Sequence, residues 1–211
     1  MNFTELEIYN FRSINFIKLS NIKQINLLTG RNNCGKTSIL EAIFLLSGMS
    51  NPQLAIKIHQ FRNLDLSEDE DFSYLFPNSQ FSQYPKITGQ LNSQARTLQI
   101  KPIYNGFTNH YEPVSEKLEF KQDNFISNAS STEDTTQIEG IQFNYGIDDQ
   151  ENFQSSIKLK QREMMIPHNY RENLSAIFLS PNTIIANLGK RLEKAIIRKK
   201  TDIIIRALQE V

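Results

Sequence analysis

The sequence predicts an α/β fold in which a mixed β-sheet carries an inserted antiparallel β region and the chain ends in a long helix. Three observations support this prediction. An apolar segment runs into a glycine loop that is followed by a helical pattern, short alternating segments fill residues 86–160, and a second helical pattern covers about 182–210. Because no Gly/Ser-rich linker and no internal repeat separates these patterns, we predict one domain over residues 1–211.

Composition and charge are those of an ordinary globular protein. The 211 residues are 39% hydrophobic and 22% charged, and 23 Lys and Arg residues balance 23 Asp and Glu residues. This zero net charge gives no overall attraction to nucleic acid, so any such contact must come from a local patch. One cysteine excludes an intrachain disulfide, and no apolar run resembles a membrane span or a secretory signal. We therefore expect a cytoplasmic protein without membrane contact.

The first fifty residues predict three strands, a glycine loop and a helix. Residues 3–8 alternate between two faces, 15–19 form a second short strand, and 25–29 form a compact apolar strand before the loop. From Thr37, apolar residues recur at three- and four-residue spacings, and Gly48 is a typical helix stop. A strand, a glycine loop and a helix in this order are the setting that a phosphate-binding loop requires.

Further strands and helices are predicted along the rest of the chain. Pro52 begins a helix that continues to about Leu64, and the pattern of a short strand returns at 176–179, before the helix that starts at Asn182. The segments between them that alternate like antiparallel strands are 87–91, 97–104, 117–121, 138–145 and 154–159.

The loop at residues 30–37 matches the phosphate-binding P-loop at every fixed position. Its glycines allow backbone amides to point at phosphates, and the next helix presents the positive end of its dipole. Lys36 would supply a positive charge to the β- and γ-phosphates, and the Thr37 hydroxyl would bind Mg²⁺. The predicted ligand is a nucleoside triphosphate with Mg²⁺. The predicted binding residues here are Gly30, Asn32, Asn33, Cys34, Gly35, Lys36, Thr37 and Ser38.

Five stretches of the chain carry a family resemblance. Three are Leu6-Glu7-Ile8-Tyr9-Asn10-Phe11-Arg12-Ser13, the loop from Gly30 to Ser38, and Leu40-Glu41-Ala42 in the helix. The other two are Asn51-Pro52 through Phe61-Arg62, and Phe178-Leu179-Ser180-Pro181 before the last helical pattern. Together they resemble the ABC-like, AAA-type ATPases of the RecF, SMC and OLD-nuclease group, and most of all the OLD/RecF-like branch. The resemblance implies ATP and Mg²⁺ as ligands. It also implies that Arg12 and Ser13 lie beside the phosphates or base of the nucleotide, although Arg12 could instead be an exposed turn residue.

The sequence departs from that family in the elements that hydrolyse ATP. We find no Leu-Ser-Gly-Gly-like signature and no apolar strand ending in Asp-Glu, because Asp202 precedes the apolar run 203–205 and Asp148 follows a polar, turn-like segment. We therefore interpret the chain as the N-terminal part of an OLD/RecF-like ATPase whose hydrolysis elements lie outside it. Without a carboxylate to position metal and water, it should bind ATP with little or no turnover.

The resemblance also implies partners and a wider role. These would be a second copy of the chain or a complementing ATPase or nuclease chain, acting in DNA transactions or in defence against phage. Two other function classes stay open. One is a non-catalytic module whose protein interactions depend on nucleotide, and the other is a kinase or GTPase, which the lack of an Asn-Lys-x-Asp sequence disfavours.

Smaller signals add little to this interpretation. Cys34 lies near a helix start and Lys36, which favours a reactive thiol and a redox switch, but we favour a small residue that simply fits the loop. The basic residues between 190 and 200 could grip nucleic acid, although a solvated helix face is the more common reason for such a pattern. The three histidines lack the spacing of metal ligands, so Mg²⁺ is the one metal predicted.

Overall fold

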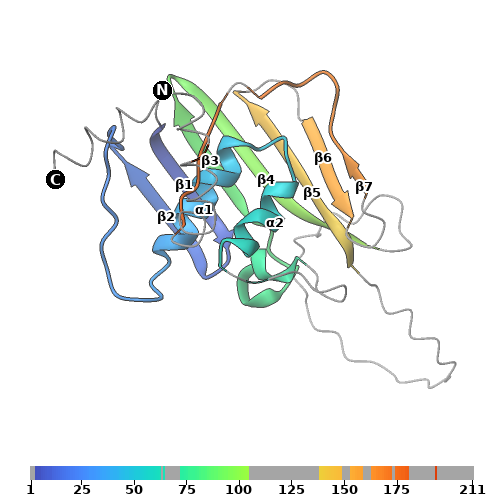
Figure 1. Ribbon diagram of the computed structural model, residues 1–211, viewed down its shortest axis with the longest axis horizontal. Coiled ribbons are helices and arrows are strands. Elements are labelled where there is room, and N and C mark those ends of the chain that lie inside the picture. The colour runs from blue at the N-terminus through green and yellow to red at the C-terminus, as the bar shows by residue number, and fades with distance from the viewer. Residues whose placement is uncertain are drawn as a thin grey trace, which may run out of the picture.

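A seven-stranded sheet forms the centre of the computed structural model, which describes residues 3–62, 64, 72–104, 138–148, 153–158, 163–172, 174–180 and 193. The strand order is β2-β1-β3-β4-β5-β6-β7, and each neighbouring pair is antiparallel (Figure 1). The strands are β1 (Phe3–Phe11), β2 (Ile14–Ser20), β3 (Lys86–Leu91), β4 (Gln94–Tyr104), β5 (Ile138–Ile147), β6 (Phe153–Lys158) and β7 (Glu163–Met165).

Two α-helices cover one face of this sheet. They are α1 (Lys36–Ser47) and α2 (Gln53–Gln60), and the short 3₁₀ turns η1 (Ser73–Leu75) and η2 (Pro77–Ser79) follow them (Figure 1). The predicted helix stop is confirmed, because Gly48 caps α1 and its N–H donates to the carbonyl oxygen of Leu45. Within the described residues, neither helix is long and apolar enough to cross a lipid bilayer.

The hydrophobic core lies between the sheet and the two helices. Strand β1 shows how the sequence places it, because Leu6 and Ile8 are buried beneath the helices while Glu5 and Glu7 face the other way. An irregularity in the β1–β3 register between Phe3 and Glu5 brings Phe3 into the core as well. The largest fully buried side chains are Leu6, Ile8, Phe11, Leu45, Leu46, Met49, Ile58, Phe72, Leu75, Phe76, Phe143 and Tyr145.

A buried ion pair joins the sheet to the segment that follows β7. Arg96 of β4 is 4% exposed, and its Nη2 atom lies 2.6 Å from a carboxylate oxygen of Glu172. The same carboxylate accepts hydrogen bonds from the Tyr170 hydroxyl at 3.1 Å and from the Leu174 backbone N–H at 3.0 Å. Burial raises the pKa of Tyr170 to about 12, and the nearby Glu172 adds to this shift. These contacts hold the segment close to the end of α1, where Arg96 also reaches the Leu46 carbonyl oxygen.

The antiparallel region is confirmed, but its expected relation to the rest of the sheet is wrong. Strands β3, β4, β5 and β6 match the predicted segments to within a few residues. However, β3 pairs antiparallel with β1, so the region extends the N-terminal sheet, and the described residues form no mixed sheet with a separate insertion. The strand predicted at 117–121 lies outside the described residues, and so does the C-terminal helix predicted at 182–210, apart from Glu193.

The apolar segment 25–29 is not the strand that its composition predicts. Ile25 and Leu27 are 89% and 86% exposed, and the segment has no strand assignment. The Asn26 side chain accepts a hydrogen bond from the Lys23 N–H at 2.9 Å and donates one to the Lys23 carbonyl oxygen at 2.7 Å. These two bonds tie the Asn26 side chain to the backbone of Lys23, as Asn side chains often do outside regular strands.

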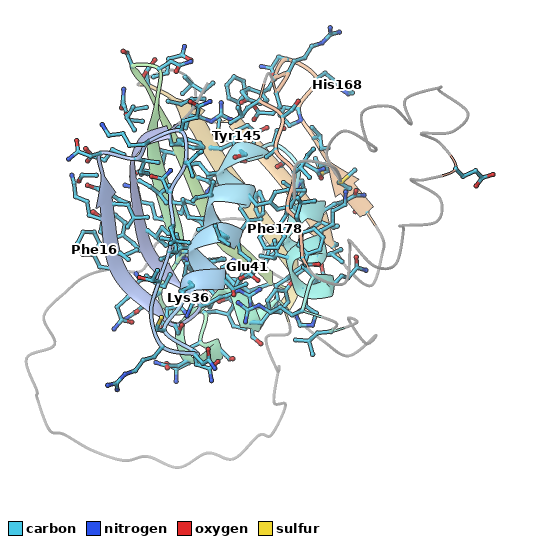
Figure 2. All side chains as sticks on the ribbon, turned by 60° about the vertical axis from the view of Figure 1, so that its left-hand side comes forward. Phe16, Lys36, Glu41, Tyr145, His168 and Phe178 are labelled. Carbon is cyan, nitrogen blue, oxygen red and sulfur yellow. The ribbon has the colours of Figure 1, made fainter. Side chains whose placement is uncertain are left out.

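The segment 176–179 also forms no strand. The Phe178 ring stacks on that of Phe61, with centroids 4.7 Å apart, and meets the edge of the Phe44 ring at 5.7 Å. Ile177 and Leu179 are exposed on either side of it. The segment is therefore held against the helices by aromatic packing rather than by backbone pairing, and Figure 2 shows Phe178 beside α1.

Candidate nucleotide-binding site

A pocket of about 630 Å³ opens at the N-terminus of α1. This volume is within the usual range for small-molecule sites. Figure 2 shows Lys36 at this end of the helix. The pocket brings together every predicted binding residue except Gly30 and Arg12, and it adds Arg62. Its lining consists of Ser13, Asn32, Asn33, Cys34, Gly35, Lys36, Thr37, Ser38 and Arg62.

The backbone of the loop depends on two glycines. Gly35 precedes α1 with φ +89°, a left-handed conformation that side chains disfavour. Gly30 has φ +149°, and a Cβ there would lie 2.9 Å from the Cys34 sulfur atom. No side chain caps the start of α1, so the first amides of the helix are not used by a local acceptor. This is the arrangement in which a helix N-terminus binds an anion.

Gly35→Ala should weaken phosphate binding more than it weakens the fold. A left-handed alanine costs about 1–2 kcal/mol, and the nearest atom to the new Cβ, Ile14 Cγ1, lies at an ordinary 3.5 Å. Relief of this strain would turn the loop amides away from the pocket. We expect a fall in unfolding temperature of a few degrees and at least a roughly tenfold loss of ATP affinity by calorimetry. An unchanged affinity would contradict this account of the loop.

The ammonium group of Lys36 lies over the loop. Its Nζ atom donates hydrogen bonds to the carbonyl oxygens of Gly30 at 2.8 Å and Arg31 at 2.6 Å, and it lies 3.6 Å from the Cys34 sulfur atom. These contacts keep a positive charge at the pocket instead of letting it extend into solvent. A phosphate in the pocket would find this cation and the helix amides on the same side.

Behind the pocket, a fully buried carboxylate holds two arginines. Glu41 of α1 is 0% exposed, and its Oε2 atom lies 2.8 Å from Arg12 Nε. Arg62 meets the same carboxylate through two nitrogens, with Nε at 2.7 Å from Oε1 and Nη2 at 2.9 Å from Oε2. Such a bidentate pair fixes the plane of the guanidinium group. Glu41 therefore ties α1 both to the β1–β2 turn and to the end of α2.

Arg12 lies behind the pocket and does not line it. Its side chain is 10% exposed, so the alternative of a solvent-exposed turn residue is wrong. The guanidinium group lies over the Tyr74 ring, 5.2 Å from its centroid. The backbone N–H of Arg12 donates a hydrogen bond to the Leu75 carbonyl oxygen. Burial lowers the pKa of Arg12, and Glu41 opposes that shift. Ser13, the next residue, does line the pocket.

Sequence reasoning named no role for Glu41 or Arg62. A signal for Glu41 was present, because it is an acidic residue on the buried face of α1, between Ser38 and Leu45 at helical spacing. A buried acid on such a face needs a cationic partner. Arg62 ends one of the stretches that resemble the ATPase family, but nothing in its spacing connected it with the loop, since it follows α2 by two residues.

The residues of the pocket fit a polyphosphate with Mg²⁺. Lys36, Arg62 and the loop amides are donors for phosphate oxygens, and the Thr37 hydroxyl is the kind of oxygen ligand that Mg²⁺ accepts. A site with one protein oxygen suits Mg²⁺, which usually keeps several waters and binds through substrate phosphates. In the described part of the chain, no group of three or more His, Cys, Asp and Glu residues could hold a metal ion.

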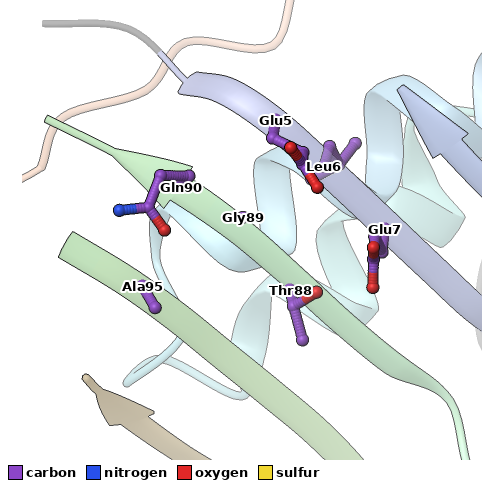
Figure 3. Close-up of a pocket in the computed structure, with 7 residues that line it drawn as sticks. All are labelled: Glu5, Leu6, Glu7, Thr88, Gly89, Gln90 and Ala95. Carbon is purple, nitrogen blue, oxygen red and sulfur yellow. The ribbon is translucent and has the colours of Figure 1, made fainter. Parts of the chain in front are cut away.

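A second depression, of about 370 Å³, lies on the other face of the sheet (Figure 3). It is lined by Glu5, Leu6, Glu7, Thr88, Gly89, Gln90 and Ala95. The Glu7 carboxylate accepts hydrogen bonds from Lys18 and Tyr9, and these bonds lower its pKa. Because carboxylates border this depression, it suits phosphate less well than the loop pocket does.

Comparison with known protein families shows to which family the chain belongs. Residues 1–210 match the model of the AAA ATPase domain. The chain belongs to this AAA ATPase family. The predicted resemblance to AAA-type, ABC-like ATPases is therefore confirmed, while its placement in the OLD branch stays a prediction.

Relatives of this AAA ATPase domain match parts of the chain. The DNA replication and repair protein RecF of Nitrosococcus oceani is 52% identical over 46 residues, which are 22% of this chain and 13% of the relative. RecF of Shewanella woodyi is 35% identical over 117 residues, 49% of this chain and 32% of the relative. An ATP/GTP phosphatase of Helicobacter pylori is 26% identical over 136 residues, 63% of this chain and 34% of the relative. The chain thus spans about a third or less of the length of these relatives.

Proposed function

We propose that this AAA ATPase domain binds ATP with Mg²⁺ through the loop at residues 30–37, as the N-terminal part of a RecF- or OLD-like ATPase. One observation carries the proposal. The Lys36 ammonium group and the uncapped start of α1 belong to one pocket, and Gly35 has the left-handed backbone that such a loop requires. The family assignment supports ATP as the nucleotide.

Each residue has a distinct task in this proposal. The amides of residues 32–37 would surround the phosphates, while Lys36 would neutralise charge on the β- and γ-phosphates. Thr37 would contribute its hydroxyl to Mg²⁺, and Ser38 a further polar contact at the helix start. Bound ATP and Mg²⁺ would supply the phosphoryl group and the charge that activates it for transfer.

Hydrolysis by this chain should be slow. None of the residues that the structure shows lining the pocket is Asp or Glu. Glu41 is close by, but its two oxygens are already engaged by Arg12 and Arg62. Positioning of the attacking water would therefore depend on a carboxylate from a further segment, a second copy or a complementing ATPase or nuclease chain. The same observation favours the alternative of a non-catalytic module that uses nucleotide to order an interaction surface.

Calorimetry with Mg²⁺–ATP and Mg²⁺–GTP, followed by an assay of phosphate release, tests this function. We expect binding of ATP in preference to GTP and negligible turnover. Turnover that returns when a complementing chain is added would support the incomplete ATPase over the interaction module. Brisk turnover by the chain alone would contradict our account, and so would the absence of any nucleotide binding.

Nucleotide should protect Cys34 from alkylation. The thiol is exposed and lines the pocket beside Lys36, so bound phosphates would cover it. We expect Mg²⁺–ATP at saturating concentration to slow modification of this one cysteine several-fold, as measured by intact mass against time. Adenosine, which lacks phosphates, is the matched control and should leave the rate unchanged. Equal rates with ATP and adenosine would show that phosphates do not occupy this loop.

A link to DNA is the wider part of the proposal. Two of the relatives are named for DNA replication and repair, and another is named as an ATP/GTP phosphatase. Because the chain has no net charge, DNA contact would rely on a local basic surface and should weaken steeply with salt. Fluorescence anisotropy with labelled duplex DNA, with and without ATP, measures this directly.

A further inference from the structure

The cluster of Arg12, Glu41 and Arg62 carries an unbalanced positive charge. In the part of the chain that the structure describes, two guanidinium groups share one carboxylate, and the Arg12 and Glu41 side chains are 10% and 0% exposed. Water therefore screens the charges of Arg12 and Glu41 poorly, and charged groups are costly to bury without enough partners. A bound anion close to the cluster would lower this cost.

Arg62 is the member of the cluster that reaches the pocket. Its side chain is 35% exposed and lines the pocket together with Lys36 and Ser38. Nε and Nη2 face the Glu41 carboxylate, and Nη2 also lies 3.4 Å from Ser38 Oγ. The two N–H bonds of Nη1 are used by neither residue. A guanidinium group that is clamped on one edge keeps its remaining donors in a fixed plane, as planar recognition of phosphate requires.

We propose that Arg62 contacts a phosphate of the bound nucleotide, that Glu41 positions it for this contact, and that the ligand offsets the positive charge by which the two arginines exceed Glu41 among the described residues. This inference rests on the proposed function and assigns a ligand-contacting residue outside the loop. A ligand in the pocket would then also affect the ion pair of Arg12 with Glu41, since Arg12 and Arg62 share the Glu41 carboxylate. Through that carboxylate, the ligand would stabilise the contacts of α1 with the β1–β2 turn.

The test compares the wild-type chain with Arg62→Ala and Arg62→Lys. Calorimetry measures the affinity of each for Mg²⁺–ATP and for inorganic tripolyphosphate with Mg²⁺, which has no base or sugar. Removal of a charged hydrogen bond should weaken binding of both ligands about tenfold or more in Arg62→Ala. The affinity of Arg62→Lys should lie between those of the wild-type chain and Arg62→Ala, because lysine keeps the charge but cannot form the bidentate contact with Glu41. Arg171→Ala, at an exposed arginine away from the pocket, is the matched control and should bind like wild type.

Each outcome decides between the two proposals. If the wild-type chain binds neither ligand, the proposed function itself is wrong. If it binds both and Arg62→Ala and Arg62→Lys are unchanged, the function stands and the role of Arg62 is overturned. Weaker binding of ATP with unchanged binding of tripolyphosphate would place Arg62 at the base or sugar and also overturn the phosphate contact. Thermal unfolding checks that each variant is folded, and if Arg62→Ala is not, a several-fold loss in Arg62→Lys decides the question.

Discussion

Lys36→Ala is expected to lower the affinity of the domain for Mg²⁺–ATP at least a hundredfold. Its ammonium group lies over the loop, 2.8 Å and 2.6 Å from the Gly30 and Arg31 carbonyl oxygens. Two charged hydrogen bonds to phosphate contribute about 3 kcal/mol or more, which corresponds to a factor of roughly a hundred. Titration calorimetry at fixed Mg²⁺ concentration gives both affinities directly.

The matched control for this substitution is Lys57→Ala. Lys57 lies on the exposed face of α2 and lines no part of the pocket, so its removal should leave ATP affinity within a factor of two of wild type. Because both variants lose one positive charge, the comparison separates a contact with phosphate from a change in net charge. Equal affinities of Lys36→Ala and wild type would exclude the loop as the nucleotide site.

Glu41→Gln is expected to have the largest effect on folding stability. It keeps the shape of the side chain but removes the charge that offsets two arginines, and Glu41 is fully buried. Removal of one partner from a buried ion pair costs about 3–5 kcal/mol. For a chain of this size, that corresponds to a fall in unfolding temperature of roughly 6–20 °C. Thermal unfolding followed by circular dichroism measures the shift.

Glu7→Gln is the matched control for Glu41→Gln. Glu7 also pairs with a basic residue, Lys18, but the pair lies on the solvent-facing side of the sheet. Exposed pairs contribute little, so the unfolding temperature should change by no more than a few degrees. A Glu41→Gln variant as stable as Glu7→Gln would show that the buried cluster does not hold α1 in place. A double-mutant cycle of Glu41→Gln with Arg62→Gln would then measure any coupling that remains.

Local sequence patterns predicted the elements that depend on neighbouring residues. The alternation of Leu6 and Ile8 against Glu5 and Glu7 predicted β1, and the four strands from β3 to β6 follow similar patterns. Gly48 marked the end of α1, and the glycines of the loop marked its start. These predictions succeeded because the spacing of apolar residues and the signals for turns and helix caps each depend on a short run of consecutive residues.

Strand pairing was less predictable, as two apolar segments show. Segments 25–29 and 176–179 have the composition of buried strands, yet Leu27 and Ile177 are exposed and neither segment pairs. A strand forms when another strand supplies its hydrogen bonds, and composition does not say whether that partner is adjacent. The antiparallel pairing of β3 with β1 across some seventy intervening residues was unpredictable for the same reason.

The sequence by itself predicted the loop at residues 30–37 that we propose as the phosphate site, because its fixed residues all lie within eight consecutive positions. Tertiary structure alone decided the charge arrangement behind it. Arg12, Glu41 and Arg62 are separated by more than twenty residues each, and no spacing rule connects them. They meet because the β1–β2 turn and the end of α2 both pack beside α1, where a buried carboxylate requires cationic partners.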